Sequence, residues 1–339
     1  MEAEAATSCP PARGMLMAQG RTFTFDDPDR YAAGFRDASV KLTITGAGDF
    51  SAKLTQLKLK HLEVRWCHES LPRIAHISLS LKRLFLSFPV GRMSPILDGS
   101  PLGNRDIVFH GLGESMHQRF ARECEWGLIS VSPQHLSGCS EALNGWPIPS
   151  PHASRILHLP RAEVTRFQRI FKQARQMADA RTRLIERSEV ARALEQEMFH
   201  TIVHLLNADG PNDHSRKRHN HAAIMARFEE ALPRCLDRKI RLPALCSEVG
   251  VPERTLRMCC ADFLGVSPTR YLLLQRLNKV RSALQRADAS TTSVTEIAQK
   301  HQFVELGRFA VNYRTTFGET PSTTLEREPL PSAKSAEGA

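Results

Sequence analysis

The sequence contains no apolar run that approaches the ~18 residues of a membrane-spanning helix. Its start also does not resemble a secretory signal, because Glu2 and Glu4 are acidic and Pro10 and Pro11 follow them. The eight cysteines include no C-x-x-C pair and have no regular spacing, so neither a metal staple nor a disulfide framework is predicted. We therefore expect a cytoplasmic protein without a membrane partner, whose cysteines are small buried hydrophobic residues.

Motifs of several enzyme classes are also missing. No G-x-S-x-G elbow, P-loop or dinucleotide-binding glycine motif occurs in a fitting context. One segment, His110 to His117, resembles the second metal motif of cupin-type enzymes, but the upstream histidines His61, His68 and His76 are scattered where a close pair would be needed. We expect no catalytic residue, no metal and no cofactor, and a cupin-type metal-dependent enzyme is the alternative.

What the chain does have is length and positive charge. Its 339 residues suffice for two domains, and 41% hydrophobic with 24% charged residues is typical of a globular protein. Of the net charge of +10, about eight lies between Arg216 and Arg327, where 19 Lys or Arg stand against 11 Asp or Glu. This concentration favours a nucleic-acid partner over a generally basic surface.

The first part of the chain has the period of β-strands. Short alternating apolar runs, separated by turn residues, predict many strands in a sandwich or barrel. We assign residues 1–20 to a disordered lead and 21–145 to a β-rich domain. The predicted strands lie in Phe50 to Leu54, Leu57 to Leu59, Leu62 to Trp66, Ile74 to Leu79, Leu84 to Phe88, Ile107 to Phe109 and Trp126 to Val131.

After Pro160 the apolar period changes from two to about 3.6, which predicts two amphipathic helices within residues 146–206. Their apolar stripes fit either packing against the strands or a homodimer interface. The polar stretch 207–221, with Gly210 and Pro211, is the predicted linker. The stripes are Val164, Phe167, Ile170, Phe171, Ala174, Met177 and Ala178, and then Val190, Leu194, Met198, Ile202 and Leu205.

The last third contains an internal repeat of a helix, a tight turn and a second helix. The first copy covers about residues 242–264 and ends before Gly265. The second copy covers about 293–317, begins with the capping box of Ser293 and Glu296, and has a turn one residue longer. A third helix, opened by Ser267 and Pro268, connects the copies. Its ~20 residues span about 30 Å, close to the ~34 Å between successive major grooves.

The residues of this repeat resemble the AraC/XylS family of transcription regulators. The resemblance covers about residues 222–326, and it lies in Ala244 to Phe263, Ser293 to Ala298, Phe303, Arg308–Phe309, Tyr313–Arg314, Phe317–Gly318 and Pro321. It implies an α+β multidomain protein, with an N-terminal β-rich cupin-like domain and a C-terminal all-α domain of two helix-turn-helix motifs joined by a linker helix. It also implies double-stranded DNA and RNA polymerase as partners, an unknown small-molecule effector and transcriptional activation. Residues 327–339 are predicted to be a disordered tail.

Base contacts are expected from the outward faces of the two recognition helices. In the first motif Arg254 and Arg257 can each present a guanidinium fork to guanine, while Thr255 and Met258 can contact bases through a hydroxyl or a methyl group. The corresponding and neighbouring candidates in the second motif are Leu306, Gly307, Arg308, Val311, Asn312 and Arg314.

Three positions depart from the family pattern. Val311 stands where Arg is common, so the second motif is expected to contribute less direct readout and more backbone positioning. Gln302 stands where Gly is common, and Pro252 replaces the usual Ser cap. Lys279, Arg281, Lys300 and Arg314 are candidates for phosphate contacts. A sequence-neutral architectural DNA binder is the second alternative function, since it would share the basic charge.

Overall fold

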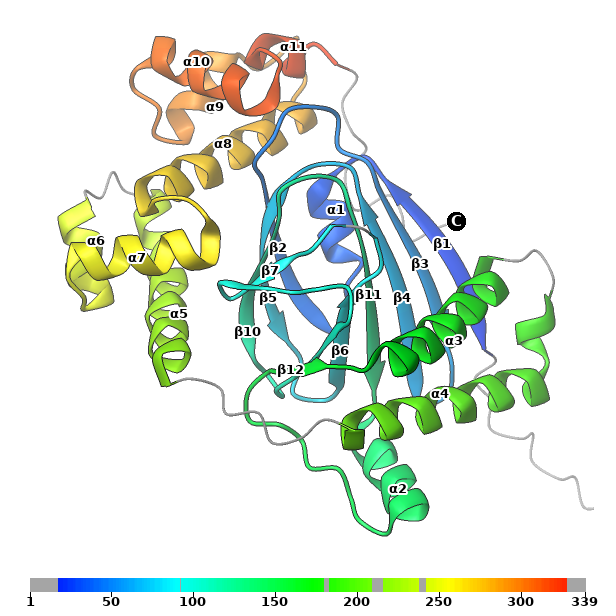
Figure 1. The fold of residues 1–339 in the computed structure, drawn as a ribbon. Coiled ribbons are helices and arrows are strands. Elements are labelled where there is room, and N and C mark those ends of the chain that lie inside the picture. The colour runs from blue at the N-terminus through cyan, green and yellow to red at the C-terminus, as the bar shows by residue number, and fades with distance from the viewer. Residues whose placement is uncertain (1–17, 92, 180–182, 209–215, 238–241, 328–339) are drawn as a thin grey trace, which may run out of the picture.

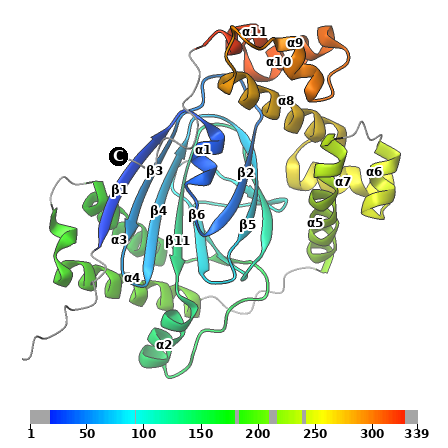
Figure 2. The same cartoon turned by 180° about the vertical axis from the view of Figure 1, so that it is seen from behind.

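The computed structural model describes residues 18–91, 93–179, 183–208, 216–237 and 242–327. Figures 1 and 2 show a β-sandwich with helices along one side, and a helical domain that lies against its other side. The β-rich N-terminal region and all-α C-terminal region predicted from the sequence are thereby confirmed. Of the predicted disordered lead and tail, residues 1–17 and 328–339 lie outside the described residues, whereas Gln19 already belongs to a strand.

The sandwich consists of two antiparallel sheets. The larger has the order β1-β3-β4-β11-β6-β9-β12 and the smaller β2-β5-β10-β7-β8. The strands of the first are β1 (Gln19–Phe25), β3 (Ala52–Lys58), β4 (Leu62–Glu69), β11 (Cys124–Val131), β6 (Leu84–Pro89), β9 (Asp106–His110) and β12 (Arg155–His158). The strands of the second are β2 (Ala38–Ile44), β5 (Arg73–Leu79), β10 (Ser115–Phe120), β7 (Ile96–Leu97) and β8 (Ser100–Pro101).

The predicted strands match β3, β4, β5, β6, β9 and β11, whereas β1, β2, β7, β8, β10 and β12 of the described residues were not predicted. Phe50 is buried but precedes its strand. The edge strand β1 was missed because its side chains are mostly exposed and carry little apolar alternation. β12 lies inside the region predicted as helical, because four residues are too few to establish a period.

The space between the sheets is filled by aromatic side chains around the buried ion pair of Glu69 and Arg73. Phe35 stacks on Trp126 with ring centroids 5.8 Å apart. Glu69, which is fully buried, accepts hydrogen bonds from Arg73 Nε (2.6 Å), Tyr31 Oη (2.9 Å) and Trp126 Nε1 (2.9 Å). The remaining cavity there measures about 30 Å³, room for a water molecule or two. This cavity is therefore too small for an organic ligand.

Helices cover the outer face of the large sheet (Figures 1 and 2). The apolar stripe of α3 is buried against it, with Phe167 and Phe171 packed on Phe88 and Phe171 also on Trp66. In the stripe of α4, Val190 is half-buried and the other four residues are buried in the same cluster. Both stripes are thus used for packing within one chain, and a dimer would need other surfaces. The helices of this part are α1 (Pro28–Ala33), α2 (Pro133–Asn144), α3 (Arg161–Asp179), the short 3₁₀ helix η1 (Arg183–Glu186) and α4 (Ser188–Ala208).

The C-terminal region is a chain of helices. The segment 207–221, predicted as a linker, has helix at both ends, because α4 ends at Ala208 and α5 begins at Arg216. Within the described ranges, no helix combines the length and the hydrophobicity that crossing a bilayer requires. The helices are α5 (Arg216–Asp237), α6 (Leu242–Val249), α7 (Glu253–Leu264), α8 (Pro268–Arg286), α9 (Val294–Lys300), α10 (Leu306–Phe317) and α11 (Pro321–Leu325).

Candidate nucleic-acid interface

The first helix-turn-helix unit consists of α6 and α7. Gly250 forms the turn in the left-handed region (φ 72°), and Gly265, also left-handed (φ 71°), ends α7. Leu256, Cys260 and Phe263 face inward and are buried, as the spacing predicted. Pro252 makes no side-chain cap, but α7 nevertheless begins directly after it, at Glu253.

The two cysteines of helix α7 are buried core residues. Cys259 and Cys260 are both fully buried in α7. Burial raises the pKa of each thiol, so both stay protonated at neutral pH. Of the seven cysteines in the described part of the chain, six are buried and Cys139 is partly buried, in agreement with their prediction as small core residues.

The second unit repeats this geometry in α9 and α10. The predicted capping box is present: the Ser293 hydroxyl accepts from the Glu296 N–H (3.2 Å), and the Glu296 carboxylate accepts from the Ser293 N–H (2.8 Å). Gly318 (φ 79°) ends α10 as Gly265 ends α7. The bounds of the four helices give a turn of three residues (250–252) in the first unit and of five (301–305) in the second, so the second turn is two residues longer and not one as predicted.

The second turn contains a strained residue. Gln302 occupies the left-handed region (φ 66°), where the first unit has Gly250. A side chain there costs about 1–2 kcal/mol because Cβ approaches the carbonyl oxygen. With glutamine at this position instead of glycine, the turn still forms, but its backbone conformation is less favourable.

We expect Gln302→Gly to stabilise the C-terminal domain by about 1 kcal/mol, since glycine adopts this conformation without a steric penalty. Gln302 is exposed, so few packing contacts are lost. Chemical denaturation measures the change, and Gln299→Gly, at an exposed position inside helix α9, is the control that should destabilise. A loss of stability in the Gln302 variant would contradict the strain argument.

Helix α8 holds the two units apart. It runs from one unit to the other, with α6 and α7 at its first end and α9 and α10 at its second (Figure 1). Its N-cap is Ser267, whose hydroxyl accepts from the Arg270 N–H. The 19 residues of α8 span roughly 28 Å, close to the ~34 Å between successive major grooves.

Comparison with known proteins places the repeat in a family. The profile of a helix-turn-helix domain matches residues 245–327. A probable thc operon regulatory protein of Rhodococcus erythropolis is 44% identical over 82 residues, which are 24% of this chain and 25% of that protein. A XylDLEGF operon transcriptional activator of Pseudomonas putida is 38% identical over 92 residues, 27% of this chain and 29% of that protein. The C-terminal domain is of the AraC/XylS type.

The match of this AraC/XylS-type domain spans about a quarter of the length of the curated relatives named above. Among solved structures, the AraC-like transcriptional activator CuxR is 15% identical and aligns with 76% of this chain and 94% of its own, at a TM-score of 0.39. A probable AraC family regulator from Rhodopseudomonas palustris is 32% identical over 31% of this chain and 95% of its own, at a TM-score of 0.29.

On α7 of the AraC/XylS-type domain, the candidate readers lie on the surface. Arg254, Arg257 and Met258 are exposed, while Thr255 is half-buried. Arg257 Nη2 lies 2.6 Å from the Glu253 carboxylate one turn earlier. Arg257 must leave this exposed ion pair to reach a base, at a cost of ~1 kcal/mol or less.

On α10 the candidates divide into exposed and half-buried side chains. Gly307, Arg308, Val311 and Arg314 are exposed, whereas Leu306 and Asn312 are half-buried and Leu306 packs against the core. Arg308 pairs with Glu305 at 3.1 Å, as Arg257 does with Glu253. Two exposed arginines and Val311, 66% exposed, give this helix the means for phosphate and thymine-methyl contacts.

One predicted phosphate contact is wrong. Arg281 is buried at the boundary of the two domains, where its Nη2 donates to Gly48 O and to the Glu319 carboxylate, both at 3.1 Å. Its guanidinium also lies over the Phe317 ring, 4.6 Å from the centroid. The sequence could not show this, because the partner carbonyl comes from the loop after β2. Of the other three candidates, Lys300 and Arg314 are exposed, and Lys279, also exposed, lines a cavity described below.

Helix α8 is bound to the sandwich by polar side chains that the sequence did not single out. The Asn278 amide donates to Ile44 O (3.0 Å) and accepts from Ile44 N–H (2.9 Å), so it continues the edge of β2. Arg286 forms ion pairs with Asp27 (3.0 Å) and Asp29 (2.9 Å). The two domains are therefore in specific contact and not merely tethered.

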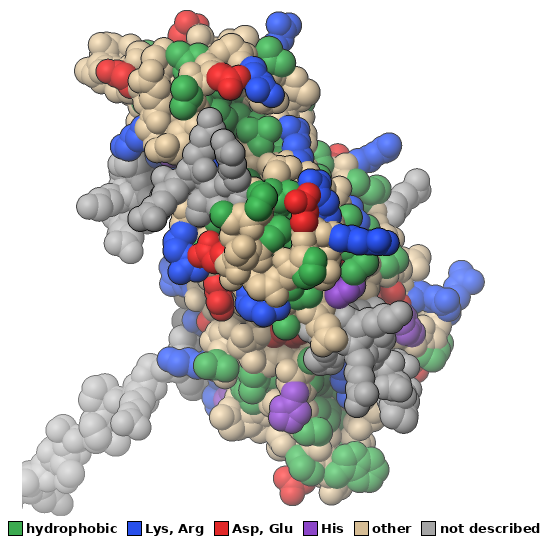
Figure 3. Space-filling view, turned by 90° about the vertical axis from the view of Figure 1, so that its left-hand side faces the viewer, with side chains coloured by type: hydrophobic (Ala, Val, Ile, Leu, Met, Phe, Trp, Pro, Cys, Tyr) green, Lys and Arg blue, Asp and Glu red, His purple; other side chains and the backbone are tan. Residues whose placement is uncertain are grey.

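Charge on the exposed surface of the domain is mixed. Figure 3 shows Lys and Arg side chains among Asp and Glu side chains and hydrophobic groups on the side that the helical domain occupies. On this face, the described basic side chains do not form one continuous patch (Figure 3).

Proposed function

We propose that the protein is a sequence-specific regulator of transcription that reads two consecutive major grooves, one with α7 and one with α10. The observation that carries this is the duplicated unit: two recognition helices with exposed arginines, each ended by a left-handed glycine and separated by helix α8. A nonspecific architectural binder needs positive charge but not two matched reading faces. Such a regulator acts in the cytoplasm, where bacterial DNA lies.

The relatives that are named operon activators support transcriptional activation and contact with RNA polymerase as the working hypothesis. The base-reading residues remain a proposal as well: Arg254, Thr255, Arg257 and Met258 in the first unit, and Arg308, Val311 and Arg314 in the second. Leu306, Gly307 and Asn312 are the weaker candidates, because two are half-buried and Gly307 has no side chain. Enzyme activity has no support from the relatives, which are named as regulators.

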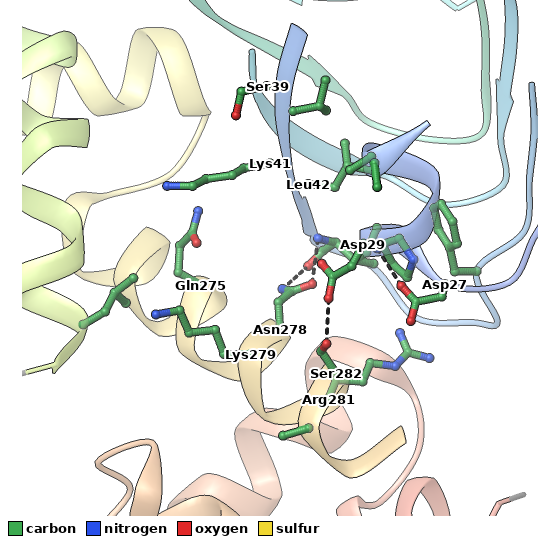
Figure 4. A pocket seen from close by; sticks show the side chains of 18 of the residues that line it. Asp27, Asp29, Ser39, Lys41, Leu42, Gln275, Asn278, Lys279, Arg281 and Ser282 are labelled. Carbon is green, nitrogen blue, oxygen red and sulfur yellow. Dashed lines mark hydrogen bonds between the residues drawn. The ribbon is translucent and has the colours of Figure 1, made fainter. Parts of the chain in front are cut away.

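An effector, we infer, binds between the domains. A cavity of about 710 Å³ lies there, lined by α1 and β2 of the sandwich and by α5 and α8 of the helical domain. Figure 4 shows Lys41, Gln275 and Lys279 at one part of the cavity and Asp27 and Asp29 at another. An anionic or hydrogen-bonding group of a small molecule suits the part lined by the two lysines and Gln275. A ligand that touches both domains can change how they are oriented.

The proposal of a sequence-specific DNA reader is tested by selecting bound fragments from sheared genomic DNA and then footprinting the protein on them. We expect two protected segments on one face of the duplex, about 10–10.5 base pairs apart from centre to centre. Diffuse protection that disappears evenly as salt rises would instead favour the architectural binder, because phosphate contacts alone carry no sequence information.

A further inference from the structure

A buried cluster of two histidines and a glutamate lies where the two domains meet. His76 on β5 and His117 on β10 are direct partners in the antiparallel register, with ring centroids 5.0 Å apart. Glu229 reaches both from α5: its Oε1 lies 2.8 Å from His117 Nε2, and its Oε2 lies 3.8 Å from His76 Nδ1. Figure 1 shows α5 and α7 beside the smaller sheet, on the side where β5 and β10 lie.

The hydrogen bonds of the cluster leave one strong acceptor unsatisfied. Glu229 Oε1 accepts from Tyr271 Oη (3.2 Å) and lies within hydrogen-bond distance of His117 Nε2, whereas Oε2 is buried and has no hydrogen-bond partner. The side chains of Glu229 and His117 are only 5% and 4% exposed. A buried carboxylate oxygen without a donor is unfavourable, so a cation at this position would stabilise it.

We propose that His76, His117 and Glu229 bind a divalent transition-metal ion, with zinc as the best chemical match, and that this ion links the sandwich to the DNA-binding domain. The three ligand atoms all lie within 4.8 Å of one another. Ligands at 2.0–2.1 Å from a tetrahedral ion lie roughly 3.3 Å apart, so movements of about an ångström suffice. Two imidazoles and a carboxylate form a known zinc ligand set that leaves a fourth position for water or another ligand.

The surroundings hold these ligands in place. The His117 N–H donates to Asp98 Oδ1 (2.8 Å), and the Asp98 N–H donates to His117 O (2.9 Å), which fixes the backbone of β10 at the ligand. Phe263 of α7 packs edge-on against the His117 ring. Tyr271 of α8 orients the carboxylate, the role that outer residues play in metal sites.

One charge opposes the ion. Lys41 is the partner of His76 in the register of β2 and β5, and its positive charge acts on both His76 and Glu229. Its side chain is exposed, so the ammonium group can extend into solvent away from the ion. Lys41 and Glu229 also line the cavity between the domains, which places the fourth coordination position near that cavity.

A bound ion would fix α5, and through Phe263 also the recognition helix α7, against the sandwich. Metal occupancy would then change the orientation of the first reading face, and by linkage DNA would change the metal affinity by the same factor. This regulatory consequence rests on the proposed function, whereas metal binding itself does not.

Titration of the untagged full-length protein with Co²⁺, followed by visible absorption, and with Zn²⁺, followed by calorimetry, tests the site. We expect one equivalent of either ion to bind to the wild type and to Glu230→Gln, an exposed neighbour on the same helix. Glu229→Gln and His76→Gln should lose more than the roughly 10- to 100-fold in affinity that removal of an outer partner costs.

Two ligand variants are used in case Glu229→Gln misfolds. His76→Gln removes a ligand but leaves the contact between His117 and Glu229 intact. Equal Zn²⁺ affinity in His76→Gln and Glu230→Gln would overturn the site. Once the DNA target is known, equal DNA affinity with and without Zn²⁺ would overturn the regulatory role. Failure to find any specific DNA target would refute the proposed function alone, since the metal titrations contain no DNA.

Discussion

Replacing Arg254 and Arg257 together by alanine is expected to weaken binding to the specific DNA site by at least about 30-fold, with little change on unrelated DNA. Each guanidinium that reads a guanine contributes about 1–3 kcal/mol of discrimination, and 1.4 kcal/mol corresponds to tenfold in affinity. Both side chains are exposed and take no part in the core, so the fold should be unaffected. Competitive mobility-shift titrations measure both affinities.

The matched control also removes two arginine charges, but from a different surface of the protein. Arg161→Ala with Arg169→Ala changes two exposed arginines on α3, on the far side of the sandwich from the reading helices. We expect this variant to bind like the wild type. If the α7 variant weakened specific and unrelated DNA equally and lowered the salt slope by about two units, Arg254 and Arg257 would be phosphate contacts and not sequence readers.

Glu69→Gln is expected to destabilise the sandwich by about 3–5 kcal/mol, the largest effect on folding that we anticipate from a single change. Burial by itself would raise the pKa of Glu69, but the charge of Arg73 and three sets of hydrogen bonds hold that pKa below its usual value. The glutamine has almost the same shape but no charge, so Arg73, which is 1% exposed, becomes a buried cation without a counterion. Urea denaturation, followed by tryptophan fluorescence, measures the loss.

Two further variants isolate the electrostatic part of this loss of stability. Glu123→Gln neutralises an exposed carboxylate and should cost about 0.5 kcal/mol or less. The double variant Glu69→Gln with Arg73→Met removes both charges, so its cost should be smaller than the sum of the two single changes by about 0.5–3 kcal/mol. Simple additivity would mean that the pair is held by shape and not by charge.

Local patterns were sufficient to predict the DNA-binding domain. The helix periods, the capping box of Ser293 and Glu296, and the glycines at 250, 265 and 318 are signals within a few residues of the chain, and each has the predicted conformation. The inward faces of both recognition helices followed from the same periods, which also identified Arg254 and Arg308 as outward. In the sandwich, alternation identified β3, β4, β5, β6, β9 and β11, but it missed the exposed edge β1, the half-buried β2 and the mostly buried β10.

Contacts between distant segments, by contrast, were decided only in the tertiary structure. Nothing near Arg281 in the sequence indicates that it turns away from solvent to bind Gly48 O, and nothing near Asn278 indicates that it binds the backbone of β2. His76 and His117 looked unrelated because their spacing fits no metal motif, yet the register of β5 and β10 places them opposite each other. Glu229 completes that cluster from a different domain.

The sequence by itself therefore determined the helices of the two helix-turn-helix units and which faces of the recognition helices are apolar, because hydrophobic period, capping and turn chemistry act between neighbours in the chain. The packing of the sandwich against α5 and α8 decided the cavity between the domains and the cluster of His76, His117 and Glu229. Such sites depend on which surfaces meet, and that is set by the complementarity of whole elements over distances that no local pattern encodes.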